Sequence, residues 1–174
     1  ETSANAATNI ESAVAVAAPG AEVRVGDGLW AMARQVAIEK PLRVRSVNGP
    51  SFTTSSVPGQ VRSFYLFHSN AIVEGFTLTT SGNGNHLMNG AGIYLLQGQI
   101  TNCIFRNITI GGQGAAIWMA GGLVSDCLIV SNRTYEWQYG YGGGIYIAPF
   151  PYFGPALVEN CRILDNLCES YRGG

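Results

Sequence analysis

The chain has 174 residues, a formal net charge of −1 and 12% charged residues, about half the usual share for a globular protein. This near-balance of charge disfavours nucleic-acid binding, which needs a basic surface. No uninterrupted apolar run approaches the roughly 18 residues of a membrane-spanning helix, and the hydrophobic fraction of 47% favours a folded core over disorder.

The first predicted element is a short amphipathic helix over residues 8–18. Thr8 and Glu11 form a capping box, and Pro19-Gly20 ends the helix. Its apolar positions recur at helical spacing, at Ile10, Ala13, Val14 and Ala17. We expect this helix to cover one open end of an apolar core.

Strand-like segments follow the helix. Ala21–Val25 and Leu42–Val47 alternate between apolar and polar residues, which is typical of half-buried strands. We predict that these two segments begin a series of rungs, each rung being one circuit of a coil, and that the rungs extend over residues 21–168.

Two short motifs then recur four times each, always in the same order. The first motif has a central Tyr or Trp with a large apolar residue on each side. Its copies are Phe64–Leu66, Ile93–Leu95, Ile117–Met119 and Ile145–Ile147. The second places a Cys or Phe after two mostly polar residues, at Val73–Leu78, Ile100–Phe105, Val124–Ile129 and Val158–Ile163. The second motif begins at residues 73, 100, 124 and 158, so its copies are separated by 27, 24 and 34 residues.

Two short strands per repeat cannot bury an apolar face alone, so the repeats must stack. We therefore predict an all-β fold in which residues 1–174 form a single β-solenoid domain. Because no capping repeat is visible near Gly174, we expect the solenoid to continue beyond it or to be covered there by a neighbour.

Val23–Gly28, Lys40–Gly49 and the repeated Gly-Ile-Tyr and Asn-Cys-x-Ile motifs follow the helix in order. This succession resembles right-handed parallel β-helix proteins of the pectate-lyase-like class, and the repeats are similar to those of polymorphic outer-membrane adhesins. The resemblance implies a right-handed parallel β-helix with a short N-terminal capping helix. It also implies an extracellular or cell-surface location, because such solenoids are common in large secreted bacterial proteins.

In parallel rungs, equivalent residues stack about 4.8 Å apart. The second motif predicts one inward column, made of Phe76, Cys103, Cys127 and Cys161. We interpret its cysteines as buried apolar residues, because no basic neighbour in the repeat would lower a thiol pKa. No metal or cofactor site is predicted, since the cysteines form no CxxC pair and the sequence has no Asp-rich cluster for calcium. We expect Asn residues to line one column of turns, at Asn107, Asn132 and Asn166.

The first motif predicts an outward aromatic column of Tyr65, Tyr94, Trp118 and Tyr146, with Arg24 and Arg43 on the same line. Tyr94, Trp118 and Tyr146 are candidate ligand-binding residues, because flat rings accept the apolar faces of sugars or a partner's surface. The alternative, which the pattern favours slightly, is that the chain's own loops cover the column and that it only stabilises the stacking of rungs.

A second aromatic cluster lies in two insertions, Asn132–Gly144 and Pro149–Pro155. Its rings are Tyr135, Trp137, Tyr139, Tyr141, Phe150, Tyr152 and Phe153. Because the solenoid does not require these insertions, we interpret the cluster as a binding surface, with Tyr135, Trp137, Tyr139 and Tyr152 as the candidate contacts. The alternative is that the loops pack on each other and on Tyr146.

The family resemblance also implies possible cleavage of polysaccharides. Glu74 and Glu159 share one column but lie three rungs apart, about 14 Å, which exceeds the separation of about 5–9.5 Å in glycosidase carboxylate pairs. Asp126, Glu159 and Arg162 are the weak catalytic candidates, and a solvated polar corner explains them equally well.

The sequence thus favours a secreted or surface-displayed, non-catalytic scaffold for adhesion, glycan contact or subunit assembly through exposed aromatics. Its expected partners are a polysaccharide or a protein surface, without nucleic acid or cofactor. Two alternatives stay open. One is a polysaccharide lyase or glycoside hydrolase, and the other is a head-to-tail filament that forms through an open C-terminal rung.

Overall fold

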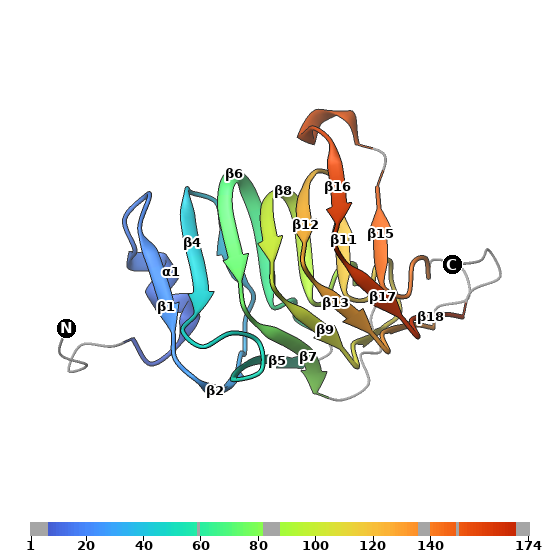
Figure 1. Cartoon of the computed structure of the whole chain (residues 1–174), viewed down its shortest axis with the longest axis horizontal. Helices are drawn as coiled ribbons and strands as arrows, with labels where there is room; N and C mark the ends of the chain where they lie inside the picture. The colour runs from blue at the N-terminus through green and yellow to red at the C-terminus, as the bar shows by residue number, and fades with distance from the viewer. Residues whose placement is uncertain (1–6, 59, 82–87, 136–139, 149, 170–174) are drawn as a thin grey trace.

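The computed structural model describes residues 7–58, 60–81, 88–135, 140–148 and 150–169, and in these ranges the chain forms a parallel β-solenoid. Figure 1 shows the strands of successive rungs lying side by side along the long axis of the molecule. The strand pairs are parallel, so each rung is hydrogen-bonded to the rung before it. The predicted solenoid is thereby confirmed.

A short helix, α1 (Ile10–Val16), lies at the N-terminal end of the solenoid (Figure 1). Its N-cap is Asn9, whose side-chain oxygen accepts a hydrogen bond of 2.7 Å from the backbone N–H three residues later. The sequence predicted Thr8 in this role. The cap lies one residue further along because Asn9 has the extended backbone that an N-cap needs. Ile10 and Val14 are buried in the core, so the helix covers its N-terminal end.

The strands are short, apart from β6 and β8. The strands of the N-terminal half are β1 (Glu22–Val25), β2 (Gly28–Ala31), β3 (Val36–Ile38), β4 (Leu42–Ser46), β5 (Thr53–Pro58), β6 (Phe64–Glu74) and β7 (Thr77–Ser81). Those of the C-terminal half are β8 (Ile93–Thr101), β9 (Ile104–Arg106), β10 (Thr109–Ile110), β11 (Ile117–Met119), β12 (Gly122–Ser125), β13 (Leu128–Val130), β14 (Arg133–Thr134), β15 (Ile145–Ile147), β16 (Ala156–Glu159), β17 (Arg162–Leu164) and β18 (Leu167–Cys168). A 3-10 helix, η2 (Pro151–Phe153), lies between β15 and β16.

β6 and β8 are long because each bends round an edge of the solenoid and takes part in two of its faces. The beginning of β6 pairs with β3, and its end pairs with β4. In the same way, β8 pairs first with β11 and then with β12. The register between β6 and β8 shifts at the bend, between Leu66 and Ile72. Two further sheets, β2-β5-β7-β9-β13-β17 and β10-β14-β18, complete the circuit.

One continuous file of apolar side chains runs through the interior. Phe64 pairs with Ile93, Ile93 with Ile117, and Ile117 with Ile145. The first three are fully buried, and Ile145 in the last rung is half-buried. The inward direction that the period of two predicts for these residues is confirmed.

The cysteine column also lies where the repeats predict it. Phe76, Cys103 and Cys127 are buried, and Cys161 is half-buried. The hydrogen-bonded thiol of Cys103, together with burial, raises the pKa of Cys127, and burial raises the pKa of Cys161. These cysteines therefore pack as neutral thiols, as expected for small core residues.

Two sequence assignments of columns are wrong. Arg24 and Arg43 do not share the line of Tyr65, because β1 pairs with β4 and β4 pairs with the second half of β6, whereas Ala37 of β3 pairs with Tyr65. Both strands therefore belong to the other face, where Arg43 forms an ion pair with Glu74.

Asn107 does not share a column with the other two Asn residues. It has a positive φ of 54°, as Ser131 does one rung later, so both form the turn itself. Asn132 and Asn166 follow the turn and point inward. The side-chain amide of Asn132 donates to the side-chain oxygen of Asn166 at 2.8 Å, and its own oxygen accepts from the backbone N–H of Ile108 at 3.1 Å. The prediction placed Asn107 one residue too early, because the residue equivalent to Asn132 in the preceding rung is Ile108.

Candidate functional site

The aromatic column is a tight stack. Tyr65, Tyr94, Trp118 and Tyr146 occupy equivalent positions in β6, β8, β11 and β15. The rings of Tyr94 and Trp118 lie 4.1 Å apart with an interplanar angle of 9°, and those of Tyr65 and Tyr94 lie 5.7 Å apart. Offset or parallel stacking of this kind stabilises neighbouring strands.

The middle of the stack is covered by other parts of the chain. The guanidinium of Arg62 lies 4.7 Å from the centre of the Tyr94 ring, and burial lowers the pKa of Arg62 and raises that of Tyr94. Trp118 donates a hydrogen bond of 3.3 Å to the side chain of Gln113 and contacts the ring of Phe150 at 6.0 Å. Trp118 is only 4% exposed, so most of its ring surface is already in contact with the protein.

The β15–β16 loop, meaning residues 148 and 150–155, is attached to the solenoid on both sides of Tyr152. Phe150 packs on Trp118, and Phe153 makes an edge contact with Phe67 at 6.1 Å. Gly121 allows the backbone of Phe153 to approach, because a Cβ at Gly121 would lie too close to the carbonyl oxygen of Phe153. The loop is therefore held in place by aromatic packing and by one close backbone contact.

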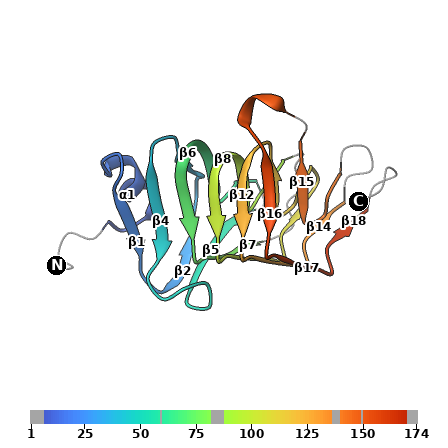
Figure 2. The ribbon, with the colours of Figure 1, turned by 45° about the horizontal axis from the view of Figure 1, so that its top comes forward.

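Tyr152 itself is 85% exposed. Figures 1 and 2 both show η2 rising beyond the bends of the neighbouring rungs. Phe153 is half-buried and Phe150, although 48% exposed, contacts Trp118, whereas the ring of Tyr152 is the most exposed of the three. The loop thus presents the ring of Tyr152 from an anchored backbone.

A groove with a volume of about 550 Å³ lies beside Tyr152. Its floor is made by Gly98 and Gly122, which have positive φ angles of 103° and 87° at the same bend in successive rungs. A Cβ at Gly98 would lie 2.6 Å from the carbonyl oxygen of Ala71, and a Cβ at Gly122 would lie 2.5 Å from that of Gly98, so the neighbouring rung leaves no room for a side chain at either position. Its lining is formed by uncharged residues, namely Ser69, Gln97, Gly98, Gly122, Leu123, Tyr152, Phe153, Gly154, Pro155 and Leu157.

The other aromatic residues that the sequence predicts as ligand contacts are less exposed than Tyr152 or lie outside the described residues. Tyr146 is half-buried and lies 6.0 Å from the ring of Tyr141, so part of the second cluster does pack against the aromatic column. Tyr135 is half-buried at the end of β14, where its backbone N–H donates to Ile110. Trp137 and Tyr139 lie outside the described residues.

The weak catalytic candidates lie on an exposed corner between β12 and the later strands. The side chains of Asp126, Glu159 and Arg162 are all exposed. The backbone N–H of Asp126 donates to the carbonyl oxygen of Glu159 at 3.3 Å. Asp126 follows the last residue of β12, whereas Gly122 in the groove is its first, so the corner and the groove lie at opposite ends of this strand.

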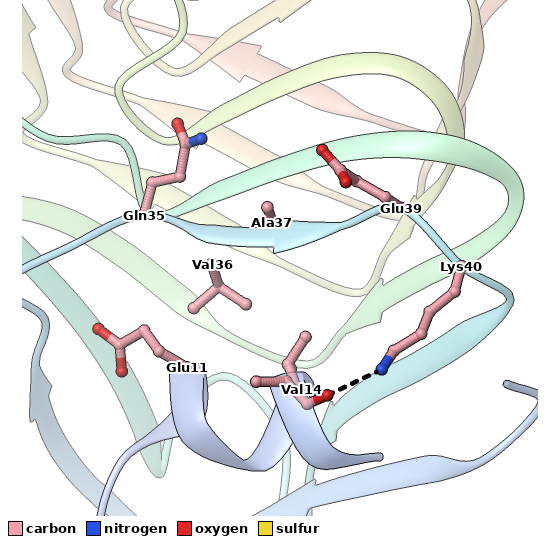
Figure 3. Close-up of a pocket in the computed structure, with 8 residues that line it drawn as sticks. Glu11, Val14, Gln35, Val36, Ala37, Glu39 and Lys40 are labelled. Atoms are coloured by element: carbon pink, nitrogen blue, oxygen red, sulfur yellow. Dashed lines mark hydrogen bonds between the residues drawn. The ribbon is translucent and has the colours of Figure 1, made fainter. Parts of the chain in front are cut away.

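A second hollow of about 450 Å³ lies between α1 and β3 (Figure 3). Lys40 reaches across it and donates hydrogen bonds of 3.2 Å and 2.6 Å to the carbonyl oxygens of Ala15 and Ala17. Glu11 and Glu39 are among the residues that line this hollow. Lys40 thus satisfies carbonyl groups at the C-terminal end of the helix and fixes it to the solenoid.

The last rung leaves apolar side chains exposed. Ile163 pairs with the fully buried Ile129 but is itself 50% exposed, and Leu164 and Leu167 are also exposed. This rung covers the core on one side and has no described strand on the other side.

Comparisons with protein-family models, curated proteins and solved structures returned no match. Among the residues that the structure describes, no three His, Cys, Asp or Glu side chains are grouped so that they could hold a metal ion. Within the same ranges, no helix has both the length and the apolar character that crossing a bilayer requires.

Proposed function

We propose that this protein is a non-catalytic scaffold that binds carbohydrate through Tyr152 and the groove beside it. The observation that carries the proposal is the exposed ring of Tyr152 on a loop that Phe150 and Phe153 attach to the solenoid. The loop is already held in place, and a Tyr side chain has only two torsion angles to fix, so little conformational freedom is lost when a ligand binds to the ring.

Polar groups beside the ring suit the same ligand. The amide of Gln97 and the hydroxyl of Ser69 line the groove, and both can donate and accept hydrogen bonds. Sugar hydroxyls also do both, and a sugar ring has apolar faces that can lie against Tyr152. Catalysis is disfavoured because Asp126 and Glu159 lie at the other end of β12 from the groove.

Protein binding or adhesion through the same loop is the neighbouring possibility. The uncharged groove, which has amide and hydroxyl groups next to a single ring, favours a glycan over a protein surface. We propose an extracellular or cell-surface location for two reasons. The sequence resembles secreted solenoids, and the proposed ligand is a glycan.

The experiment compares the retention of three proteins in affinity electrophoresis through gels that contain polysaccharide. Tyr152→Ala should weaken binding at least about fivefold, because a ring contact contributes on the order of 1 kcal/mol. Tyr152→Phe keeps the ring and should bind as the wild type does. Phe52→Ala removes another exposed ring and serves as the matched control.

Unchanged retention of Tyr152→Ala would contradict the binding site. Release of reducing ends from any bound polysaccharide would contradict the non-catalytic part of the proposal.

Subunit assembly is a second candidate, which the exposed Ile163, Leu164 and Leu167 of the last rung favour. Because α1 covers the N-terminal end, a second copy would pair through its own last rung, in a closed dimer instead of a head-to-tail filament. A mass that rises with concentration and stops at a dimer would support this form of assembly. Filaments in micrographs would support the head-to-tail form, and a constant monomer mass would exclude both.

A further inference from the structure

We infer that the carbohydrate bound beside Tyr152 is an electrically neutral polymer that lies along the solenoid axis. This inference rests on the proposed function and adds the chemical class and the direction of the ligand. Two independent features of the groove support the inference. The residues that line it are uncharged, and they belong to successive rungs of the solenoid.

The first feature is that none of the lining residues of the groove carries a charge. A sugar carboxylate that enters such a groove loses water and gains no cation in return, which is unfavourable. An acidic glycan would need an Arg or Lys in the groove, or carboxylates that hold a bridging cation. The lining includes neither.

Five cations in the described part of the chain are engaged away from the groove. Arg45 lies 3.1 Å from Glu22, and Arg43 and Arg133 form ion pairs with Glu74 and Glu169. Arg62 lies over the aromatic column, and Lys40 is bonded to α1. Neither these five groups nor any other Arg or Lys is among the residues that line the groove.

The second feature is that the lining comes from successive rungs. Ser69 belongs to β6, Gln97 to β8, Leu123 to β12 and Leu157 to β16. Three steps between neighbouring strands span about 14 Å. A groove of this length, which runs across the strands, accommodates several sugar units of one chain, whereas a single sugar would contact only part of it.

The test uses one polymer in two charge states. Fully methyl-esterified polygalacturonan is neutral, and the same polymer after demethylation is a polyanion, so the two differ chiefly in charge. Neutral glucan, galactan and mannan complete the panel. We expect at least one neutral polymer to retard the wild type, with a dissociation constant at least tenfold lower than for the polyanion.

Binding to the neutral polymer should also change less than twofold when sodium chloride is raised from about 50 mM to 500 mM, because no charges are paired. Gln97→Lys places a cation in the groove and should create salt-sensitive binding to the polyanion. Gln97→Glu is the matched control, and it should not bind the polyanion.

Each outcome is decisive. If the polyanion binds the wild type as tightly as the neutral polymers or more tightly, the inference is overturned and the proposed glycan site stands. If a neutral polymer binds but oligomers of two and eight sugars bind equally tightly, the axial direction is overturned. If no polymer of the panel binds, the proposed function is overturned and this inference with it.

Discussion

When equivalent residues of successive rungs stack, one side chain can shift the pKa of the next, as Cys127 shows. Its thiol is buried next to that of Cys103, and the hydrogen bond between them and burial raise its pKa. Folding therefore favours the protonated thiol. The stabilisation that this preference gives is complete below the pKa of the unfolded thiol and is lost as the pH rises above it.

We predict that the stability difference between the wild type and Cys127→Ala narrows in alkaline solution. Near pH 7 the variant should be less stable by about 1 kcal/mol, because a buried sulfur is removed. Above pH 9.0, the ordinary pKa of this thiol, the wild type loses stability through Cys127 and the variant does not. Urea denaturation with a reductant present, at several pH values, measures both proteins. A difference that does not change with pH would contradict the prediction.

At the scale of elements, the position of the β15–β16 loop depends on the absence of a side chain at Gly121. A Cβ there would displace the backbone of Phe153 and, with it, the contact with Phe67. We predict that Gly121→Ala lowers the free energy of unfolding by about 1–3 kcal/mol and weakens polysaccharide retention as much as Tyr152→Ala does. Gly26→Ala is the control, because a Cβ at Gly26 would have no atom within 4 Å. Equal behaviour of the two variants would show that the loop does not depend on this contact.

The same loop marks how far the sequence predicts the site. The longest spacing between repeats reveals the insertions, and Tyr152 is one of the four candidate contacts that their aromatic residues suggest. Gln97 and Ser69 were missed because they lie in different repeats, and no motif within one repeat shows which residues meet beside the β15–β16 loop. The sequence carries a partial signal in two of the four repeats, where Gly98 and Gly122 lie five residues after the start of the first motif.

The fold was more predictable than the site, for a physical reason. Alternation with a period of two fixes which side chains point inward, so the file through Ile93 and Ile117 follows from the residues alone. Alternation is the same on every face, however, and it does not say to which face a strand belongs. Arg24 and Arg43 were placed on the wrong face for that reason.

At the scale of the whole molecule, a solenoid is stabilised rung by rung, because each rung contacts only its neighbours. Inner rungs are covered on both sides. The last rung is covered on one side only, and its apolar residues show this directly, since Ile163 is half exposed although it pairs with a fully buried Ile129. Stability should therefore decline toward the C-terminal end of the described chain.

We predict that equivalent substitutions in neighbouring rungs differ severalfold in their effect on stability. Ile129→Ala opens a cavity in the core and should lower the free energy of unfolding by about 2–5 kcal/mol. Ile163→Ala removes a side chain that is still 50% exposed, and it should cost about 1 kcal/mol or less. Chemical denaturation measures both values, and hydrogen exchange should show faster exchange in β17 than in its neighbour β13. If Ile163→Ala proves as costly as Ile129→Ala, a second copy or another partner covers the last rung in solution, and the same variant should then also lower the measured mass of the protein.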